Sequence, residues 1–411
     1  MKFNIITLGC KVNSYESNFM KEALVKNGFS FCSENDKCDI LILNTCTVTD
    51  TSDKKSLKEV RRLKRENPHA ILVVCGCSVQ NDKNKYDNLD IDVLMGNINK
   101  SNIVSIINEY LDKKTPLEYV AKTRDLNFEN MEIDSFDHTR AYIKIEDGCD
   151  NFCSYCVIPF VRGKTRSKNF DLAIKETKTL VENNFKEIVL TGIDTGAYFD
   201  NGKDLTDLIK EMSKIEGLKR IRQSSIEITQ INDKFIEELK NNPKICNHIH
   251  IPLQSGSDEI LRLMNRKYDL NYFFEKIEKI RSVRPDISIT TDVIVGFPNE
   301  TDELFLETLE TCKKINFSKI HVFPYSERKG TKASLMSGKV SENVKHERVK
   351  KLMELSEKLE KEYYDKFKGK ELDVLIEEVE NDGVSIGHTS NYLKVELNEK
   401  LTKGEIYLRK L

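Results

Sequence analysis

The sequence of 411 residues contains no tryptophan, and none of its apolar runs reaches the roughly 18 residues that a membrane-spanning helix needs. The apolar stretch within Met1–Cys10 is also too short for a signal peptide. We therefore expect a cytoplasmic protein that does not associate with membranes. Without tryptophan, any stacking on nucleic-acid bases has to use Phe, Tyr or Arg side chains.

The chain also lacks an excess of either charge, with 65 Lys and Arg against 67 Asp and Glu. This balance excludes a uniformly basic nucleic-acid binder but allows a local basic patch. A hydrophobic fraction of 39% and a charged fraction of 32% are typical of a folded globular chain. The length predicts two to four domains.

The first hundred residues alternate short apolar runs with helical patterns, which predicts an open parallel α/β domain over residues 1–112. Continuous apolar runs are typical of parallel strands that are buried on both faces. Helices are predicted over Ser17–Asn27 and Thr51–Glu66, and the strands are predicted over Phe3–Leu8, Asp39–Asn44, Ala70–Cys75 and Asp92–Met95.

A polar, weakly periodic stretch over residues 113–134 predicts a linker, and a second α/β series follows over residues 135–366. Six strands with crossover helices favour a partial (β/α)6 barrel, which leaves one side open for a large substrate. Helices are predicted over Asp171–Asn183, Leu205–Ile215, Thr301–Ile315 and Ser341–Phe367. The strands are predicted over Ala141–Ile145, Glu187–Thr191, Arg220–Ile226, His248–Leu253, Ile287–Val295 and Lys319–Phe323.

Residues 367–411 change character and predict a small antiparallel β module. Its strand-like runs are Val374–Glu380, Gly383–His388, Leu393–Leu397 and Glu405–Leu408.

Three of the eleven cysteines stand four and three residues apart, at Cys149, Cys153 and Cys156. A loop leaving a barrel strand can wrap three thiolates around one iron–sulfur cluster, and such clusters are normally held by four cysteines. Three local ligands would leave one iron of a cubane cluster open for a substrate or cofactor. Zinc is the alternative, but zinc sites favour paired C-x2-C motifs, and the sequence has no second pair.

A second group of cysteines follows three of the N-terminal strands, at Cys10, Cys46 and Cys77. Loops at the carboxyl ends of parallel strands face one crevice, so these thiols are expected to meet. The alternative is that small thiols suit tight turns, and Cys75 competes with Cys77 for the third place. The other cysteines are predicted to be structural: Cys32, Cys38, Cys75, Cys246 and Cys312.

The sequence words LGCKVN, NTC, GCSVQ, CDNFCSYC, IPFVRGKTRS, SSIE, PLQSGSDEILRLMNRKY, DVIVGFPNET and HVFPYSERKGT occur in this order. Together they resemble the radical S-adenosylmethionine (SAM) methylthiotransferases over essentially the whole chain. The resemblance implies an N-terminal methylthiotransferase domain, a radical SAM barrel and a C-terminal TRAM-like β-barrel that binds RNA. The first and last words resemble best the branch that acts on threonylcarbamoyladenosine in tRNA.

The resemblance implies two [4Fe–4S] clusters and SAM as cofactors. Cys149, Cys153 and Cys156 would hold the cluster that binds SAM, and Cys10, Cys46 and Cys77 an auxiliary cluster, which favours Cys77 over Cys75. Polar residues at the ends of barrel strands are usually site residues, although they also serve as helix caps. The residues expected to contact SAM are Tyr155, Gly192, Asp194, Ser225, Glu227, Gln254 and Gly296.

The implied activity converts N6-threonylcarbamoyladenosine at tRNA position 37 to its 2-methylthio derivative, with an electron donor such as flavodoxin or ferredoxin and an unassigned sulfur donor. Rival hypotheses keep the enzyme but change its substrate to isopentenyladenosine-37 or to a ribosomal-protein aspartate. A rival of another class is a non-catalytic iron–sulfur protein that binds RNA or senses redox state.

Arg266 and its neighbours Arg262 and Lys267 add positive charge near the barrel mouth, whereas the C-terminal module is net acidic. A solvated charged helix is the alternative to RNA contacts at Lys54, Lys55, Lys58, Arg61, Arg62, Arg65, Arg162 and Arg166.

Overall fold

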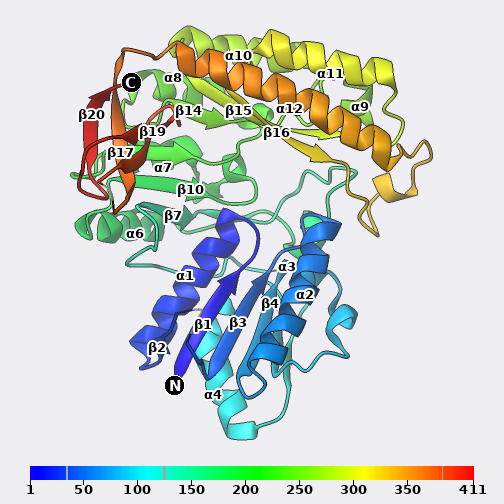
Figure 1. Cartoon of the computed structure of the whole chain (residues 1–411), viewed down its shortest axis with the longest axis vertical. Coiled ribbons are helices and arrows are strands. Elements are labelled where there is room, and N and C mark those ends of the chain that lie inside the picture. Colours follow the sequence, from blue (N-terminus) through cyan, green and yellow to red (C-terminus); the bar gives the residue numbers. More distant parts are fainter. Residues whose placement is uncertain (34–35, 124–125, 382) are drawn as a thin grey trace.

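The computed structural model describes residues 1–33, 36–123, 126–381 and 383–411, and it has the predicted α/β architecture (Figure 1). An N-terminal parallel sheet lies beneath a larger group of parallel strands, and a small antiparallel sheet lies at one end of that group. None of the helices in these ranges is long and apolar enough to cross a membrane.

The N-terminal sheet has six parallel strands in the order β2-β1-β3-β4-β5-β6. Its strands are β1 (Lys2–Thr7), β2 (Ser30–Phe31), β3 (Ile40–Thr45), β4 (Ile71–Gly76), β5 (Val93–Met95) and β6 (Leu117–Tyr119). Its helices are α1 (Lys11–Lys26), α2 (Asp50–Glu66), α3 (Cys77–Asn81) and α4 (Ile103–Lys113), with 3-10 turns η1 (Lys83–Tyr86) and η2 (Lys100–Asn102).

The sheet therefore extends beyond the predicted boundary at residue 112, because β6 pairs with β5 inside the stretch predicted as a linker. A strand of three residues with one charged member leaves no readable apolar run. Residues 124 and 125 of that stretch lie outside the described ranges.

Two three-stranded parallel sheets form the second unit, in the orders β13-β10-β7 and β14-β15-β16. Parallel bridges from Ile221 to Ile245 and from Ser225 to His250 join them into one series of six strands, as predicted. The strands are β7 (Arg140–Lys144), β10 (Glu187–Thr191), β13 (Arg220–Gln223), β14 (His248–His250), β15 (Ser288–Val295) and β16 (Lys319–Pro324).

Helices cover the outer face of these strands, and the long α12 runs across β16 (Figure 1). They are α5 (Ile158–Val161), α6 (Phe170–Glu182), α7 (Leu205–Met212), α8 (Asp233–Asn241), α9 (Asp258–Leu263), α10 (Leu270–Val283), α11 (Asp302–Ile315) and α12 (Glu342–Asp365). The connections contain β8 (Glu146–Asp147), β9 (Arg166–Ser167), β11 (Phe199–Asp200), β12 (Lys203–Asp204), η3 (Thr195–Ala197), η4 (Ile228–Gln230) and η5 (Ala333–Leu335).

The C-terminal residues form the predicted antiparallel sheet, in the order β19-β18-β17-β20. Its strands are β17 (Glu371–Val379), β18 (Ser385–Thr389), β19 (Lys394–Leu397) and β20 (Ile406–Lys410). Arg220 of β13 donates to the Asp373 carbonyl at 2.6 Å, and Arg222 donates to the Ser390 carbonyl at 3.2 Å. These bonds fix the sheet against the amino ends of the barrel strands.

Cys32 and Cys38, both predicted to be structural, form a disulfide, a pairing that the sequence does not predict. Both residues flank β1, since the Cys32 amide donates to the Phe3 carbonyl and the Asp39 amide to the Lys2 carbonyl. This arrangement places their Cα atoms 6.6 Å apart, within the usual range for a disulfide. The intervening residues 34 and 35 lie outside the described ranges.

Candidate functional site

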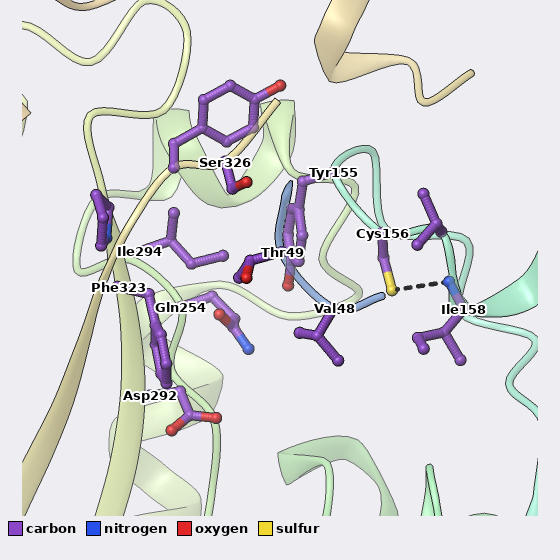
Figure 2. A pocket seen from close by; sticks show the side chains of 13 residues that line it. Val48, Thr49, Tyr155, Cys156, Ile158, Gln254, Asp292, Ile294, Phe323 and Ser326 are labelled. Carbon is purple, nitrogen blue, oxygen red and sulfur yellow. Dashed lines mark hydrogen bonds between the residues drawn. The ribbon is translucent and has the colours of Figure 1, made fainter. Parts of the chain in front are cut away.

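The loop after β8 carries the first group of thiols, at Cys149, Cys153 and Cys156. Each sulfur accepts a hydrogen bond, which stabilises a thiolate and sets the properties of a bound cluster. The donors are the Asn151 amide to Cys149 at 3.5 Å, the Ile158 amide to Cys156 at 3.5 Å (Figure 2) and the Arg266 guanidinium to Cys153 at 3.2 Å.

Arg266, expected from the sequence only to add positive charge near the barrel mouth, turns inward. Its side chain is only 4% exposed and pairs with Glu227. Burial raises the pKa of Glu227, and the charge of Arg266 opposes this shift. The pair therefore places a fixed guanidinium on the Cys153 sulfur. The basic word NRKY gave no sign that its arginine turns inward.

Glu146 explains why glycine stands at position 192. Its Oε2 accepts the backbone amides of Ile193 at 2.9 Å and Asp194 at 2.6 Å. A Cβ atom at Gly192 would lie 2.8 Å from the same oxygen, which is too close. Sequence reasoning missed Glu146, although a glutamate at the end of an otherwise buried strand is an unusual feature.

Asp194 lies beside the first thiol, with its Oδ2 4.0 Å from the Cys149 sulfur and 2.9 Å from the Asn151 side-chain nitrogen. Burial raises the pKa of both Asp194 and Glu146. One carboxylate oxygen of each is buried and has no hydrogen-bond partner among the described residues. Such oxygens are ready to accept from a ligand that carries N–H or O–H groups.

A cavity of ≈ 190 Å³ opens beside Cys156 between the N-terminal unit and the barrel (Figure 2). Of the residues predicted to contact SAM, Tyr155 and Gln254 line it, together with Val48 and Thr49 from the loop after Cys46. The cavity is also lined by Val157, Ile158, Asp292, Ile294, Phe323, Pro324, Tyr325 and Ser326. The cavity therefore lies between Cys156 of the first group of cysteines and the loop that follows Cys46 of the second.

Two further predicted SAM residues lie elsewhere. Ser225 lines a second, larger cavity of ≈ 370 Å³ inside the barrel. Gly296 has a φ of 72°, and a Cβ atom there would lie 2.3 Å from the Cγ atom of Lys345 in α12. The absence of a Cβ atom at Gly296 therefore makes room for the side chain of Lys345.

The second group of thiols lies at the carboxyl edge of the N-terminal sheet, at Cys10 before α1, Cys46 after β3 and Cys77 at the start of α3. A Cβ atom at Gly9 would lie 2.7 Å from the Cys46 sulfur, so glycine lets two of these loops touch. Burial raises the pKa of Cys46 to about 11. Cys75 differs, because it packs in the hydrophobic core beneath the sheet.

A buried ionic network lies next to this second group. Arg162 is fully buried and donates to Glu16 and Asp147, both at 3.0 Å. Its prediction as an RNA contact is therefore wrong, and Arg166 also turns inward, with 11% of its side chain exposed and Asp147 at 3.0 Å. Two carboxylates meet four cations in the network: Lys100, Lys144, Arg162 and Arg166.

Arg162 of this network lies close enough to Cys10 and Cys77 to interact electrostatically with both thiols. Nearby cations favour the thiolate form of cysteine, which is the form that binds metal. In the described ranges no three His, Cys, Asp or Glu side chains are arranged to hold a single metal ion. The donor atoms and surrounding charges of both thiol groups fit a larger anionic cluster.

Helix α2 presents most of the predicted basic residues to solvent. Lys54, Lys58, Arg61 and Arg65 follow one another along one exposed face, and Lys55 lies beside them. Arg62 differs, since it pairs with both Glu59 and Glu66. The helix begins at the interdomain cavity, where the Asp50 amide donates to Ser326 at 3.1 Å. The stripe therefore leads away from the candidate site.

Comparisons with known proteins identify the families that this chain resembles. Residues 143–312 match the radical SAM superfamily, and residues 2–96 match the uncharacterized protein family UPF0004. The threonylcarbamoyladenosine tRNA methylthiotransferase MtaB of Bacillus subtilis is 41% identical over 399 residues, which are 95% of this chain and 88% of the relative. The tRNA-2-methylthio-N(6)-dimethylallyladenosine synthase of Thermodesulfovibrio yellowstonii is 36% identical over 98% of this chain and 94% of its own length.

Among solved structures, the radical SAM methyltransferase TsrM of Kitasatospora setae, with cobalamin and a [4Fe-4S] cluster bound, is similar in fold. The TM-score is 0.58 at 12% identity, over 81% of this chain and 77% of that one. The cobalamin-dependent enzyme OxsB gives a TM-score of 0.55 at 11% identity, over 87% and 56% respectively.

Proposed function

The chain belongs to the radical SAM family of tRNA methylthiotransferases, and we propose that its substrate is N6-threonylcarbamoyladenosine at position 37 of tRNA. SAM and two [4Fe–4S] clusters are its cofactors. The names of the relatives leave two adenosine derivatives to choose between. One carries a threonylcarbamoyl group, which has a carboxylate, and the other carries a dimethylallyl group, which is wholly apolar.

The lining of the larger cavity carries the choice between these substrates. It contains Lys11, Arg140 and Arg222 together with His248 and His250. Arg140 and Arg222 already pair with carboxylates, whereas the Lys11 ammonium has no such partner in the described residues, so an apolar dimethylallyl group buried here would leave Lys11 unpaired, which is costly. A carboxylate-bearing substituent can pair with Lys11. The cavity therefore favours threonylcarbamoyladenosine.

We assign the two groups of thiols to the two clusters. Cys149, Cys153 and Cys156 would hold the SAM-binding cluster, and Cys10, Cys46 and Cys77 the auxiliary cluster. When bound, these groups supply the radical chemistry that activates C2 of the adenine and an open iron site for sulfur. A one-electron donor such as flavodoxin or ferredoxin is needed as a partner.

The protein's own residues bind and orient in this scheme. Arg266, held by Glu227, fixes the Cys153 sulfur by its hydrogen bond. Tyr155 and Gln254 form walls of the cavity beside Cys156, where the adenosine part of SAM would lie. The unpaired carboxylate oxygens of Asp194 and Glu146 are available to accept from the methionyl ammonium group.

For tRNA we propose a path along the exposed stripe of α2, where Lys and Arg side chains meet phosphates. Near the first group of thiols, Phe152 and Phe160 are 48% and 59% exposed, with ring centroids 6.1 Å apart. Exposed aromatic rings of this kind can stack on unpaired loop bases. In a chain without tryptophan, these two phenylalanine rings provide a surface for base stacking.

Nucleoside mass spectrometry tests the proposal. The anaerobically reconstituted protein, with SAM and dithionite, should convert tRNA bearing threonylcarbamoyladenosine into the 2-methylthio product and release 5′-deoxyadenosine. Product formed only on isopentenyladenosine tRNA would refute the proposed substrate. Absence of 5′-deoxyadenosine from cluster-loaded protein would refute catalysis altogether.

A further inference from the structure

The larger cavity receives residues from all three parts of the chain. Strands β7, β13, β14, β15 and β16 supply most of its wall, Lys11 comes from the start of α1, and Tyr392 comes from the loop between β18 and β19. Asp292 and Phe323 line both this cavity and the smaller one beside Cys156. The two cavities are therefore neighbours, and a substituent in one lies close to groups in the other.

Lys11 is the unmatched cation of this cavity. Arg222 pairs with Glu187 at 2.5 Å, Arg140 with Glu377 at 3.1 Å, and Lys319 with Glu360 at 2.9 Å. His250 lies 3.3 Å from Asp292. Lys11 lines the cavity, and its ammonium has no ion pair or hydrogen bond to any residue in the described ranges. Burial, together with the charges of Arg140 and Arg222, lowers the pKa of Lys11 below its usual value.

Tyr392 places a hydroxyl group beside this lysine. It has a φ of 69°, and its ring stacks between His248 and His388 at centroid distances of 4.8 and 5.0 Å. Burial alone would raise the pKa of Tyr392, but Arg140, Lys11 and Arg222 lower it below its usual value. The phenol thus points into a positive field that would also attract an anion.

Other polar atoms of the wall are buried and unpaired within the described ranges: Gln223 Oε1, Ser224 Oγ and His248 Nδ1. These three side chains are between 2% and 8% exposed. A native structure seldom leaves several such atoms together without partners. They match a ligand that carries hydrogen-bonding groups as well as a charge.

We propose that this cavity binds the threonylcarbamoyl substituent of the target adenosine, with the ammonium of Lys11 pairing with its carboxylate. The phenol of Tyr392 adds a hydrogen bond to the carboxylate, and the unpaired wall atoms bind the urea and hydroxyl groups. This inference rests on the proposed function and makes Lys11 a specificity-determining residue. Because Lys11 directly follows Cys10, the pairing would hold the substituent next to the proposed auxiliary site.

The test uses the reconstituted full-length enzyme and anticodon stem–loop RNAs that differ only at position 37, which carries threonylcarbamoyladenosine, isopentenyladenosine or adenosine. Affinity is measured by fluorescence anisotropy, kcat and KM by product formation, and both clusters by electron paramagnetic resonance. Lys11→Met should weaken binding of the threonylcarbamoyl RNA about 10-fold or more and leave the adenosine RNA unaffected. Lys11→Arg should keep most of the preference, and Tyr392→Phe should lose about threefold.

Lys210→Met, which changes an exposed lysine of α7, is the matched control and should bind all three RNAs as the wild type does. Equal weakening of all three RNAs by Lys11→Met, or no weakening, overturns the inference. So does a changed auxiliary-cluster signal with the RNA preference intact, since Lys11 would then act on the cluster. If the wild type methylthiolates only the isopentenyladenosine RNA, the proposed function fails first.

Discussion

The two groups of thiols are built in opposite ways. Cys149, Cys153 and Cys156 lie within eight residues of one loop. Cys10, Cys46 and Cys77 follow three separate strands and meet only because β1, β3 and β4 are parallel neighbours. The first group is therefore determined by local sequence and the second by the topology of the sheet.

Because of this difference, mutations should affect the two sites in different ways. A change in the loop affects one site directly, whereas the second site depends on the packing of a whole sheet edge. The neighbours also differ, because the first group receives a hydrogen bond from Arg266 and the second lies beside the network of Arg162 and Glu16. Selective substitutions can show whether the two sites work separately.

The largest effects are expected from the cysteines themselves. Cys153→Ala should reduce 5′-deoxyadenosine formation to about 1% of wild type or less, because the proposed SAM-binding cluster loses a ligand. Cys77→Ala should retain 5′-deoxyadenosine formation but lose the methylthio product. Liquid chromatography of both products, with iron content per chain, distinguishes the two variants.

Cys75→Ala is the matched control for Cys77→Ala, because it removes a thiol two residues away that packs in the sheet core. It should keep both products and the wild-type iron content. Loss of the methylthio product in Cys75→Ala, with retention in Cys77→Ala, would exchange the two assignments. It would also contradict the conclusion that the topology of the sheet determines the second group of thiols.

Much of this site could be predicted because its signals are local or depend on simple topology. The spacing of the three loop cysteines and the strand ends that carry Cys10, Cys46 and Cys77 are visible in the sequence. The observed strands β7, β10, β15 and β16 also fall within one residue of their predicted positions at each end. These segments are rich in apolar, β-branched and aromatic residues, which favours strands in a parallel sheet.

What could not be predicted depends on where long side chains point. Arg162 and Arg266 occur in basic sequence words, yet both turn inward onto carboxylates that are far away in the sequence. A guanidinium can pair with buried Glu or reach solvent from the same backbone position, and only tertiary packing decides. The roles of Glu16 and Tyr392 were missed for the same reason.

The next largest effect tests whether the network ties the second site to the barrel. Glu16→Gln leaves the four cations of the network with Asp147 as their only carboxylate and should lower the free energy of unfolding by about 3–5 kcal/mol. Chemical denaturation of the cluster-free protein measures this change. Glu354→Gln, on an exposed position of α12, is the control and should change it by less than about 0.5 kcal/mol.

The same variant should change the pH dependence of stability. Burial opposes ionisation of Glu16, but Arg162, Lys100 and Lys144 outweigh it and hold the pKa of Glu16 well below its usual value. Its contribution is therefore fully present above the unfolded pKa of about 4.3 and is lost as the pH falls below it. The difference between wild type and Glu16→Gln should shrink as the pH drops from 6 toward 3. A constant difference over this range would contradict the ionic role.

The smallest effect concerns the RNA path that begins beside the second site. Arg61→Ala removes an exposed cation without an ion pair among the described residues, and should weaken tRNA binding about threefold and reduce the salt dependence by about one ion. Arg62→Ala, one residue away, removes a cation already paired with Glu59 and Glu66, and should change binding much less. Anisotropy titrations at several salt concentrations separate the two. Equal effects would mean that tRNA does not follow this face of α2. The RNA would then have to bind on the barrel, near the first group of thiols.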